Sequence, residues 1–192
     1  MRVAVTGTPG TGKTSAVEVL AADKEFADFD LEVVHLNDLI REEGLWDERD
    51  EERDSLVADL DAVADRLANR NDVLVESHLA HHLDADRVVV LRCHPEELER
   101  RLTERGESES KAEENAESAK LPRALARKAR ENAESEALDV VLSEAVSEHG
   151  VESVYEVETT DRDPEAVAAE IAAVVAGDRE PSAGTVDYLE YL

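Results

Sequence analysis

The chain has 192 residues, of which 42% are hydrophobic and only 3% aromatic, and its formal net charge is −27. This length fits one domain, and so negative a charge excludes broad binding of nucleic acid, DNA included, by the protein surface. The charge also predicts self-repulsion in dilute buffer, which is typical of proteins adapted to high salt.

The composition excludes several further classes of protein. Cys93 is the only cysteine, so the chain forms no internal disulfide and no cysteine metal site. There is no signal-peptide pattern and no apolar run long enough to cross a membrane, which predicts a cytoplasmic protein without membrane partners. A disordered acidic chain is the alternative, but the regular spacing of apolar residues argues against it over most of the length.

The first predicted element is a short apolar strand over residues 2–6, followed by a phosphate-binding loop. The pattern G-x-x-x-x-G-K-[ST] is filled by Gly7, Gly12, Lys13 and Thr14. Glycines let the backbone N–H groups face a phosphate, the lysine reaches the outer phosphates, and the Thr14 hydroxyl can bind Mg²⁺. A glycine turn that binds nothing is disfavoured, because strand, loop, Lys-Thr pair and helix occur together in this order.

Strands and helices alternate along the rest of the chain. Alternation implies a parallel sheet covered on both faces, with the loop at the carboxyl ends of the strands. Residues 177–192 contain Pro181 and Gly184 and are expected to form an extended, mobile tail. We expect strands over 31–36, 73–76, 87–92 and 154–157, and helices over 15–22, 54–69, 95–103 and 164–175, with a long helical region over 111–149.

What happens to the bound phosphate depends on the remaining charged residues. The chain lacks the Asn-Lys-x-Asp and Asp-x-x-Gly patterns of a GTPase switch, which favours a small-molecule kinase. Such a kinase needs cations for an acceptor and a mobile lid. Arg41, in the segment after the second strand, and Arg92, at the end of the fourth, are candidates. Gly106 is a candidate hinge for the lid and is surrounded by Arg100, Arg101, Arg105 and Lys111. Arginines in so acidic a chain can instead pair with nearby carboxylates.

Several segments resemble one known family. They are GTPGTGKTS, HLNDLIREEGLWDERDEERD, VLVESHLAHHL, VVVLRCHPEELERRLTERG and ENAESEALDVVLSEA. Together they are similar to the archaeal adenylate kinases of the "isoenzyme six" type, which assist maturation of the small ribosomal subunit. The resemblance covers most of residues 1–176, and the LIREEGLWDERDEE and VESH segments are its most specific parts.

The resemblance implies an α/β P-loop NMP-kinase fold with a five-stranded parallel sheet, helices on both faces, and small NMP-binding and lid segments. It implies reversible phosphoryl transfer from ATP to AMP with Mg²⁺, an accompanying ATPase, and a role in 16S rRNA processing. It further implies transient contact with the eleventh small-subunit ribosomal protein and pre-30S particles. A metabolic kinase and an ATPase-type assembly factor with weak kinase activity both stay open as the main function.

Site residues follow from the matching positions. The kinase domain is residues 1–176, with an NMP-binding segment over 30–53, a lid over 104–114, and a tail over 177–192. Arg41 is expected on the acceptor phosphate, Arg105 on the ATP side, Glu76 near Mg²⁺ or its waters, and His78 in hydrolysis and site organisation. A metal site of His78, His81 and His82 is disfavoured for lack of a fourth ligand. The ATP and Mg²⁺ residues are Gly10, Gly12, Lys13, Thr14 and Ser15.

A repeat departs from the family pattern. Residues 111–118 (KAEENAES) recur as residues 128–135 (KARENAES), 17 positions later, which predicts a helical insertion over 119–135. Seventeen residues would rotate one continuous helix by about 100° away from whole turns, so we expect a break at 120–122 near Pro122. A second helix is then predicted over 123–147, with the second copy packed on the core. Its basic residues could contact nucleotide or rRNA, but a solvated helix is favoured.

Overall fold

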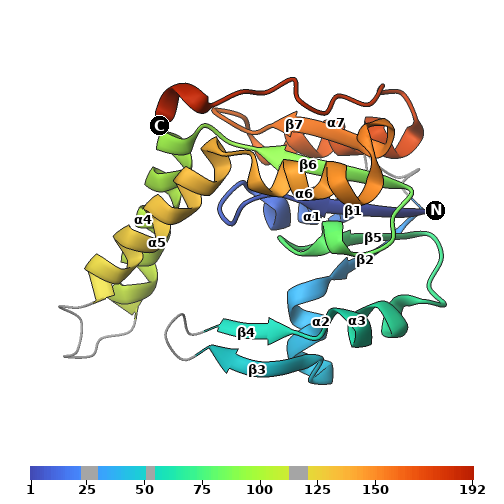
Figure 1. Cartoon of the computed structure of the whole chain (residues 1–192), viewed down its shortest axis with the longest axis horizontal. Helices are drawn as coiled ribbons and strands as arrows, with labels where there is room; N and C mark the ends of the chain where they lie inside the picture. Colours follow the sequence, from blue (N-terminus) through green and yellow to red (C-terminus); the bar gives the residue numbers. More distant parts are fainter. Residues whose placement is uncertain (23–29, 51–54, 113–120) are drawn as a thin grey trace.

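The computed structural model describes residues 1–22, 30–50, 55–112 and 121–192. At its centre is a five-stranded parallel sheet (Figure 1). Its strands are β1 (Arg2–Thr6), β2 (Glu32–His35), β5 (Val73–Glu76), β6 (Arg87–Arg92) and β7 (Val154–Glu158). They lie in the order β2-β5-β1-β6-β7, which confirms the expected fold class, and β5 and β6 have the predicted bounds.

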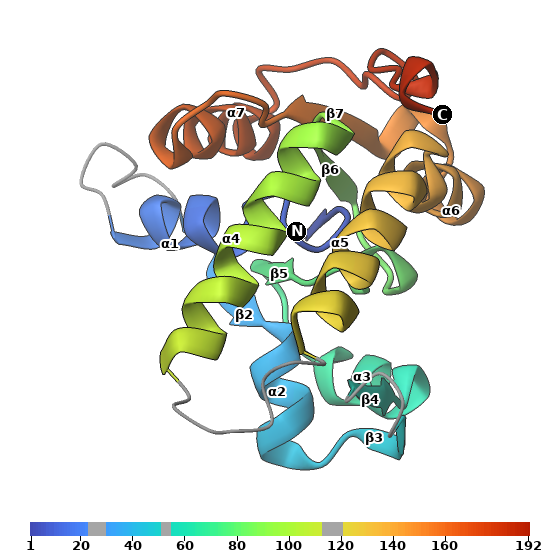
Figure 2. The same cartoon turned by 90° about the vertical axis from the view of Figure 1, so that its left-hand side faces the viewer.

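Helices cover both faces of this sheet, because successive side chains of its apolar strands point to opposite sides. On one face Val3 and Val5 pack with α1 (Lys13–Ala22) and α7 (Pro164–Ala176). On the other face Ala4 packs with α2 (Leu36–Glu43), α3 (Leu60–Leu67) and α6 (Val140–His149) (Figure 2). The core therefore consists of two apolar layers that hold the carboxyl ends of the strands in place.

A hairpin outside the main sheet was not expected from the sequence. Strands β3 (Trp46–Asp50) and β4 (Ser55–Ala58) pair in antiparallel fashion at the bottom of the view in Figure 1. The predicted helix over 54–69 is wrong in its first part, because Asp59 ends the strand and caps α3. The Asp59 side chain accepts a hydrogen bond from Ala62 N at 2.9 Å, which fixes the helix start at Leu60.

The predicted long helical region consists of separate helices. Helix α4 (Pro95–Ala112) and helix α5 (Leu121–Ala137) lie side by side and project from the sheet (Figure 2). The start of α5 agrees with a new helix near Pro122, whereas a helix continuing to residue 147 is wrong. Asp139, in the left-handed conformation with φ of 53°, separates α5 from α6.

Two expectations about this region have different outcomes. Gly106 lies buried inside α4 and not in a loop, and an added Cβ there would be 2.9 Å from Leu125 Cδ1 of α5, which argues against the expected hinge. In the second copy of the repeat, Ala129 and Ala133 are buried, as expected for a packed helix. Of the first copy, residues 113–118 lie outside the described residues.

The tail after α7 is extended but attached to the body of the protein, which corrects the expectation of a mobile segment. Ser182 N donates to Val154 O at 3.0 Å, and Thr185 N donates to Glu156 Oε2 at 2.6 Å. Tyr188 is buried, and a short 3₁₀ turn follows at Leu189–Tyr191. Further 3₁₀ turns occur at Ala80–His82 and Val151–Ser153. No helix within the described ranges is long and apolar enough to span a bilayer.

Candidate active site

The phosphate-binding loop connects β1 to α1 at the centre of the sheet edge. Its first glycine is required by space as well as by conformation, since Gly7 has φ of 140° and a Cβ there would be 2.5 Å from Leu91 O. Helix α1 begins at Lys13, so the loop ends at a helix N-terminus, where backbone N–H groups and the helix dipole favour an anion.

Lys13 is buried in this loop, and its ammonium folds back over it. Lys13 Nζ donates to Gly7 O at 2.8 Å and to Thr8 O at 3.1 Å. Burial lowers the pKa of Lys13 to about 8, although the carboxylates of Glu76 and Glu136 act in the opposite direction. A lysine with this pKa is mostly charged at neutral pH and can exchange its carbonyl partners for phosphate oxygens.

Oxygen ligands for a metal ion meet beside the loop. Thr14 Oγ1 donates to Glu76 Oε1 at 3.3 Å, and His35 Nδ1 lies 3.1 Å from Glu76 Oε2. A hydroxyl and a carboxylate are the hard oxygen ligands that Mg²⁺ prefers, and Mg²⁺ usually keeps several waters beside few protein ligands. Thr14 and Glu76 therefore suit Mg²⁺ that arrives with a nucleotide.

A first cavity, of about 440 Å³, opens around the loop. Helix α4 contributes Arg101 and Arg105 to its wall, and the segment after β7 contributes Thr159 and Arg162. Arg101 is also held in place, since its guanidinium donates to Thr159 O at 3.0 Å and contacts Glu97. The predicted loop residues that line this cavity are Gly10, Gly12, Lys13, Thr14 and Ser15.

A second cavity, of about 540 Å³, lies between α2, the β3–β4 hairpin and α5. Among the residues that the structure describes, three cations line it from separate elements: Arg41 from α2, Arg49 from β3 and Lys128 from α5. Arg41 is largely exposed, with Nη1 3.5 Å from Asp38 Oδ1. The hairpin that the sequence did not predict thus supplies part of this wall, including Leu56 and Ala58.

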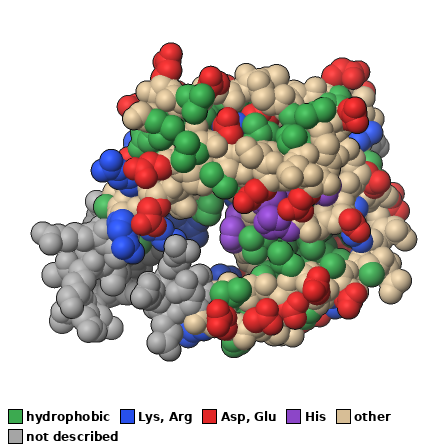
Figure 3. Space-filling model, viewed as in Figure 1, with side chains coloured by type: hydrophobic (Ala, Val, Ile, Leu, Met, Phe, Trp, Pro, Cys, Tyr) green, Lys and Arg blue, Asp and Glu red, His purple; other side chains and the backbone are tan. Residues whose placement is uncertain are grey.

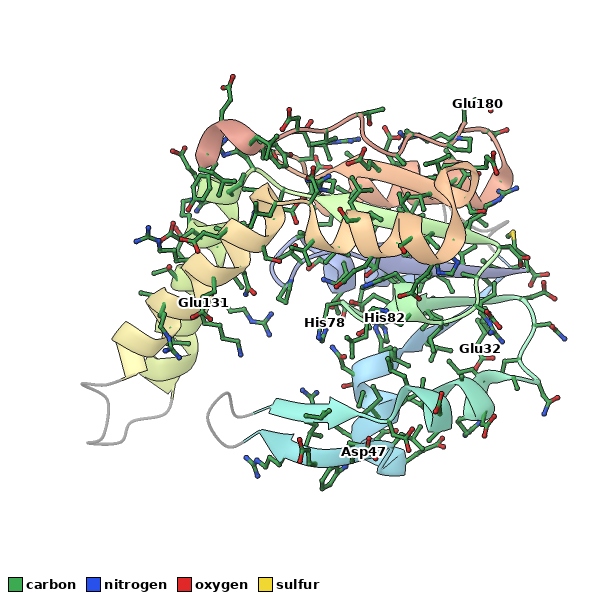
Figure 4. The ribbon with its side chains drawn as sticks, in the orientation of Figure 1. Glu32, Asp47, His78, His82, Glu131 and Glu180 are labelled. Carbon is green, nitrogen blue, oxygen red and sulfur yellow. The ribbon has the colours of Figure 1, made fainter. Side chains whose placement is uncertain are left out.

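His78 and Asn37 line both cavities, which therefore adjoin each other. Figure 4 places His78 between the sheet and the β3–β4 hairpin, and Figure 3 shows histidine side chains at the wall of the hollow there. The pKa of His78 is lowered to about 4. Burial of the ring is the largest cause, the positive charge of Lys13 is the second, and the charge of Lys128 adds to them. The imidazole is therefore neutral at physiological pH.

Acidic residues are almost excluded from the walls of these cavities. Asp and Glu make up 48 of the 192 residues, yet the second cavity has none among its described lining residues and the first has only Glu76. In a chain that repels anions overall, such a region is where phosphate groups can bind.

Arg92 does not belong to this site, contrary to the sequence-based expectation. Its side chain is 1% exposed and contacts the carboxylates of Glu136, Asp139 and Glu156. The guanidinium is thus directed into the protein and lines neither cavity. Its effect on the loop is indirect, because Thr8 Oγ1 donates to Glu136 Oε2.

The other predicted histidines do not join His78 in one site. His81 is buried, with Nδ1 2.8 Å from Thr6 Oγ1 and Nε2 3.1 Å from Glu144 Oε2. His82 Nδ1 lies 2.6 Å from Glu148 Oε1. The ligand atoms of His81, His82 and Glu144 lie within 4.8 Å of one another, but both ring nitrogens of His81 already have partners.

Sequence reasoning missed several residues of the site. Arg49 lies inside the expected NMP-binding segment and Lys128 in the second copy of the repeat, but neither was singled out as a site residue. Thr159 and Arg162 follow the last strand. The rule that ligands bind beyond the carboxyl ends of parallel strands was the available signal for Thr159 and Arg162. Lys128 belongs to the basic stretch for which contact with nucleotide was left open as the less favoured alternative, and no local pattern distinguished it from the other cations there.

The fold and the site define a P-loop protein of the kinase type, and comparison with known proteins agrees. The profile of a family described as "AAA domain" matches residues 3–122. A protein named "Putative adenylate kinase" from Natronomonas pharaonis is 62% identical over 126 residues, which are 66% of this chain and 71% of the relative. A protein of the same name from Halobacterium salinarum is 59% identical over 122 residues, 63% of this chain and 68% of the relative. The chain therefore belongs to the family of P-loop proteins that the matched profile describes and that includes these archaeal relatives.

Solved structures support the fold alone. A shikimate kinase from Bacteroides thetaiotaomicron superposes with a TM-score of 0.54 at 16% identity, covering 92% of this chain and 98% of that one. A sulfotransferase from Alicyclobacillus acidocaldarius gives 0.55 at 13% identity, covering 98% of this chain and 86% of that one.

Proposed function

We propose that the protein is a cytoplasmic nucleoside monophosphate kinase that transfers the γ-phosphate of ATP reversibly to AMP. The observation that supports this most directly is the pair of adjoining cavities. Each has cations on its wall, and among the described residues that line the two cavities Glu76 alone is acidic. A phosphoryl group bound by the loop in the first cavity would face an acceptor in the second. The names of the archaeal relatives point to the same reaction.

The chemistry asked of the protein is positioning and charge neutralisation. The phosphate of AMP is already anionic at neutral pH, so the reaction needs no general base. Lys13 would neutralise the transferring group, Arg105 would approach it from α4, and Arg41 would hold the acceptor phosphate. Mg²⁺, held by Thr14 and by Glu76 directly or through water, would supply positive charge between the phosphates.

A direct assay tests the proposal. Purified protein in molar KCl with Mg²⁺ should convert ATP and AMP to ADP, with slower ATP consumption when AMP is left out. Lys13→Ala should lower the rate by about 10² or more, because it removes a charge directed at the transferring group. If added AMP leaves ATP turnover unchanged in the wild type, the proposal is wrong.

A hydrolytic activity is the second candidate, and His78 favours it. The ring is neutral and lies where the two cavities meet, so it can accept or donate a hydrogen bond to a water near the γ-phosphate. His78→Ala should then reduce AMP-independent ATPase activity more than AMP phosphorylation. Equal loss of both rates, with an unchanged circular dichroism spectrum, would contradict the water-positioning role.

We also propose that the protein assists maturation of the small ribosomal subunit through transient contact with the eleventh ribosomal protein of that subunit. The support is the resemblance of the LIREEGLWDERDEE and VESH segments. Tagged protein should co-purify with pre-30S particles, and more of it should do so for a variant that binds ATP but hydrolyses it slowly. Absence from these particles in both forms would contradict this role.

A further inference from the structure

The acceptor side of the site contains a cation that its sequence context does not explain. Lys128 belongs to helix α5, in a basic stretch that the pattern favoured as a solvated helix surface. In the structure it lines the second cavity together with Arg41, Arg49 and His78. Figure 2 shows α5 descending from the sheet toward α2 and the β3–β4 hairpin, and Lys128 makes this helix part of the cavity wall.

The packing of α5 explains why Lys128 faces the cavity while the neighbouring Arg127 and Arg130 do not. Ala129 and Ala133 are buried, and this face of α5 lies along α4. Arg127 and Arg130 lie on the outer surface, where they pair with Glu131 at 3.5 Å and Glu134 at 3.0 Å, one turn further along.

The Lys128 ammonium differs from these arginines in having no such partner. Within the described ranges no hydrogen bond or ion pair engages it, although its charge reaches the neighbouring ring of His78. A quarter of the chain is acidic, and the nearby arginines pair with carboxylates. An unpaired cation on a wall whose described lining residues include no Asp or Glu therefore suits an anionic ligand.

We propose that Lys128 binds the phosphate of the nucleoside monophosphate acceptor, together with Arg41 and Arg49. This inference rests on the proposed function and assigns a further substrate-binding residue to it. A lysine ammonium is a compact charge on a flexible stem with three donors, so it can adjust to the position of a bound phosphate.

The test compares Lys128→Ala with a matched control, Arg127→Ala. Both variants remove one positive charge from the same turn of α5, and alanine is a good helix former at either position. A charge-assisted hydrogen bond to phosphate lost from Lys128 should raise the KM for AMP about tenfold or more. The KM for ATP should change less than about twofold, and Arg127→Ala should resemble the wild type in both constants.

Direct binding separates a phosphate contact from a structural effect. Binding can be measured by calorimetry with AMP and with adenosine, which lacks the phosphate. Lys128→Ala should weaken the binding of AMP about tenfold and leave the binding of adenosine unchanged. Lys128→Arg should recover part of the AMP affinity, since it restores the charge. If the affinities for AMP and adenosine fall equally, or if the affinity for AMP does not change, the inference is overturned.

The two proposals fail in different ways. If the wild type phosphorylates AMP and Lys128→Ala does so with the same KM, only the role of Lys128 is wrong. If the wild type binds AMP through Lys128 without phosphorylating it, the kinase function is wrong and the contact stands. If the wild type neither binds nor phosphorylates AMP, both are overturned.

Discussion

Arg92 shows how a residue can serve the site without touching a ligand. Burial alone would lower the pKa of this guanidinium, but the carboxylates of Glu136, Asp139 and Glu156 outweigh burial and raise it. Glu136 joins the cluster to the phosphate loop, because its second oxygen accepts from the Thr8 hydroxyl. The loop is thereby tied to the end of α5, the helix that also carries Lys128.

The structural role of Glu136 can be measured by removing its charge. Glu136→Gln should lower the free energy of unfolding by about 1–3 kcal/mol, because Arg92 loses one of its buried carboxylates and Thr8 its acceptor. Glu134→Gln, at an exposed pair with Arg130, should change it by less than about 0.5 kcal/mol. Denaturant unfolding in molar KCl checks both, and equal effects would show that the cluster adds nothing beyond a surface pair.

The sequence predicted which types of residue the site contains better than it predicted where their side chains point. The loop residues from Gly7 to Thr14 form a contiguous motif, so their position followed from local pattern. Arg92 was assigned to the site because it ends a strand, yet its partners Glu136 and Glu156 lie 44 and 64 positions away. Which way such a side chain points depends on tertiary contacts that a single sequence does not show.

At the scale of elements, prediction succeeded where apolar runs were strong. Strands β5 and β6 are almost wholly buried, and their bounds followed from the apolar pattern. The β3–β4 hairpin was missed because its first strand reads WDERD and has no alternating apolar face. The spacing from Leu56 to Leu67 fits a helix as well as a strand followed by a helix, and only the Asp59 cap distinguishes the two.

The packing of α4 against α5 depends on Gly106. Gly106→Val should lower the free energy of unfolding by about 1–3 kcal/mol, because the larger side chain would push Leu125 and separate the helices. Gly106→Ala should change it by about 1 kcal/mol or less, since the gain in helix propensity offsets a shift of the flexible end of Leu125. Thermal unfolding of both variants provides the measurement.

A third variant tests whether the contact with Leu125 causes the loss of stability expected for Gly106→Val. Leu125→Ala should make room for the added side chain, so the Gly106→Val change should cost less in that background than in the wild type. If Gly106→Val is harmless in the wild type, or if its cost is the same in both backgrounds, the helices do not depend on this contact. A freely moving hinge at Gly106 would give the first of these results.

At the scale of the whole molecule, charge is the dominant feature. With a net charge of −27, repulsion between like charges opposes the folded state, and screening lengths fall from about 10 Å at 0.1 M salt to about 3 Å at 1 M. The melting temperature should therefore rise steeply between about 0.1 M and several molar KCl. A flat profile would mean that the acidic surface is locally balanced and that the inference of salt adaptation is wrong.

A charge-reduced variant controls for other effects of salt on folding. Glu18, Glu42 and Glu152 are exposed, and their replacement by glutamine removes three negative charges. If repulsion sets the salt requirement, this variant should reach half of its thermal stabilisation at a lower KCl concentration. An unchanged midpoint would point to salt effects on apolar burial instead.

The repeat in the α4–α5 region offers two versions of the same helix segment. Deleting residues 119–135 would join Ser118 to Glu136, so the first copy would precede Glu136 where the second copy now does. Lys111 would then stand eight residues before Glu136, as Lys128 does now, and alanines would again fall at the two buried positions. The helix register toward the core would be kept, because the removed length is one whole repeat.

Deleting residues 119–135 should therefore give a shorter α4–α5 pair that still folds and phosphorylates AMP. In that background Lys111→Ala should raise the KM for AMP about tenfold or more, because Lys111 has taken the place of Lys128. In the full chain the same Lys111→Ala change should leave this KM within about twofold, since Lys128 still faces the acceptor. Steady-state kinetics of the four proteins decide the matter. Loss of folding on deletion would show that the full-length pair of helices is integral to the domain, and an active deletion variant insensitive to Lys111→Ala would show that no lysine is needed at this position.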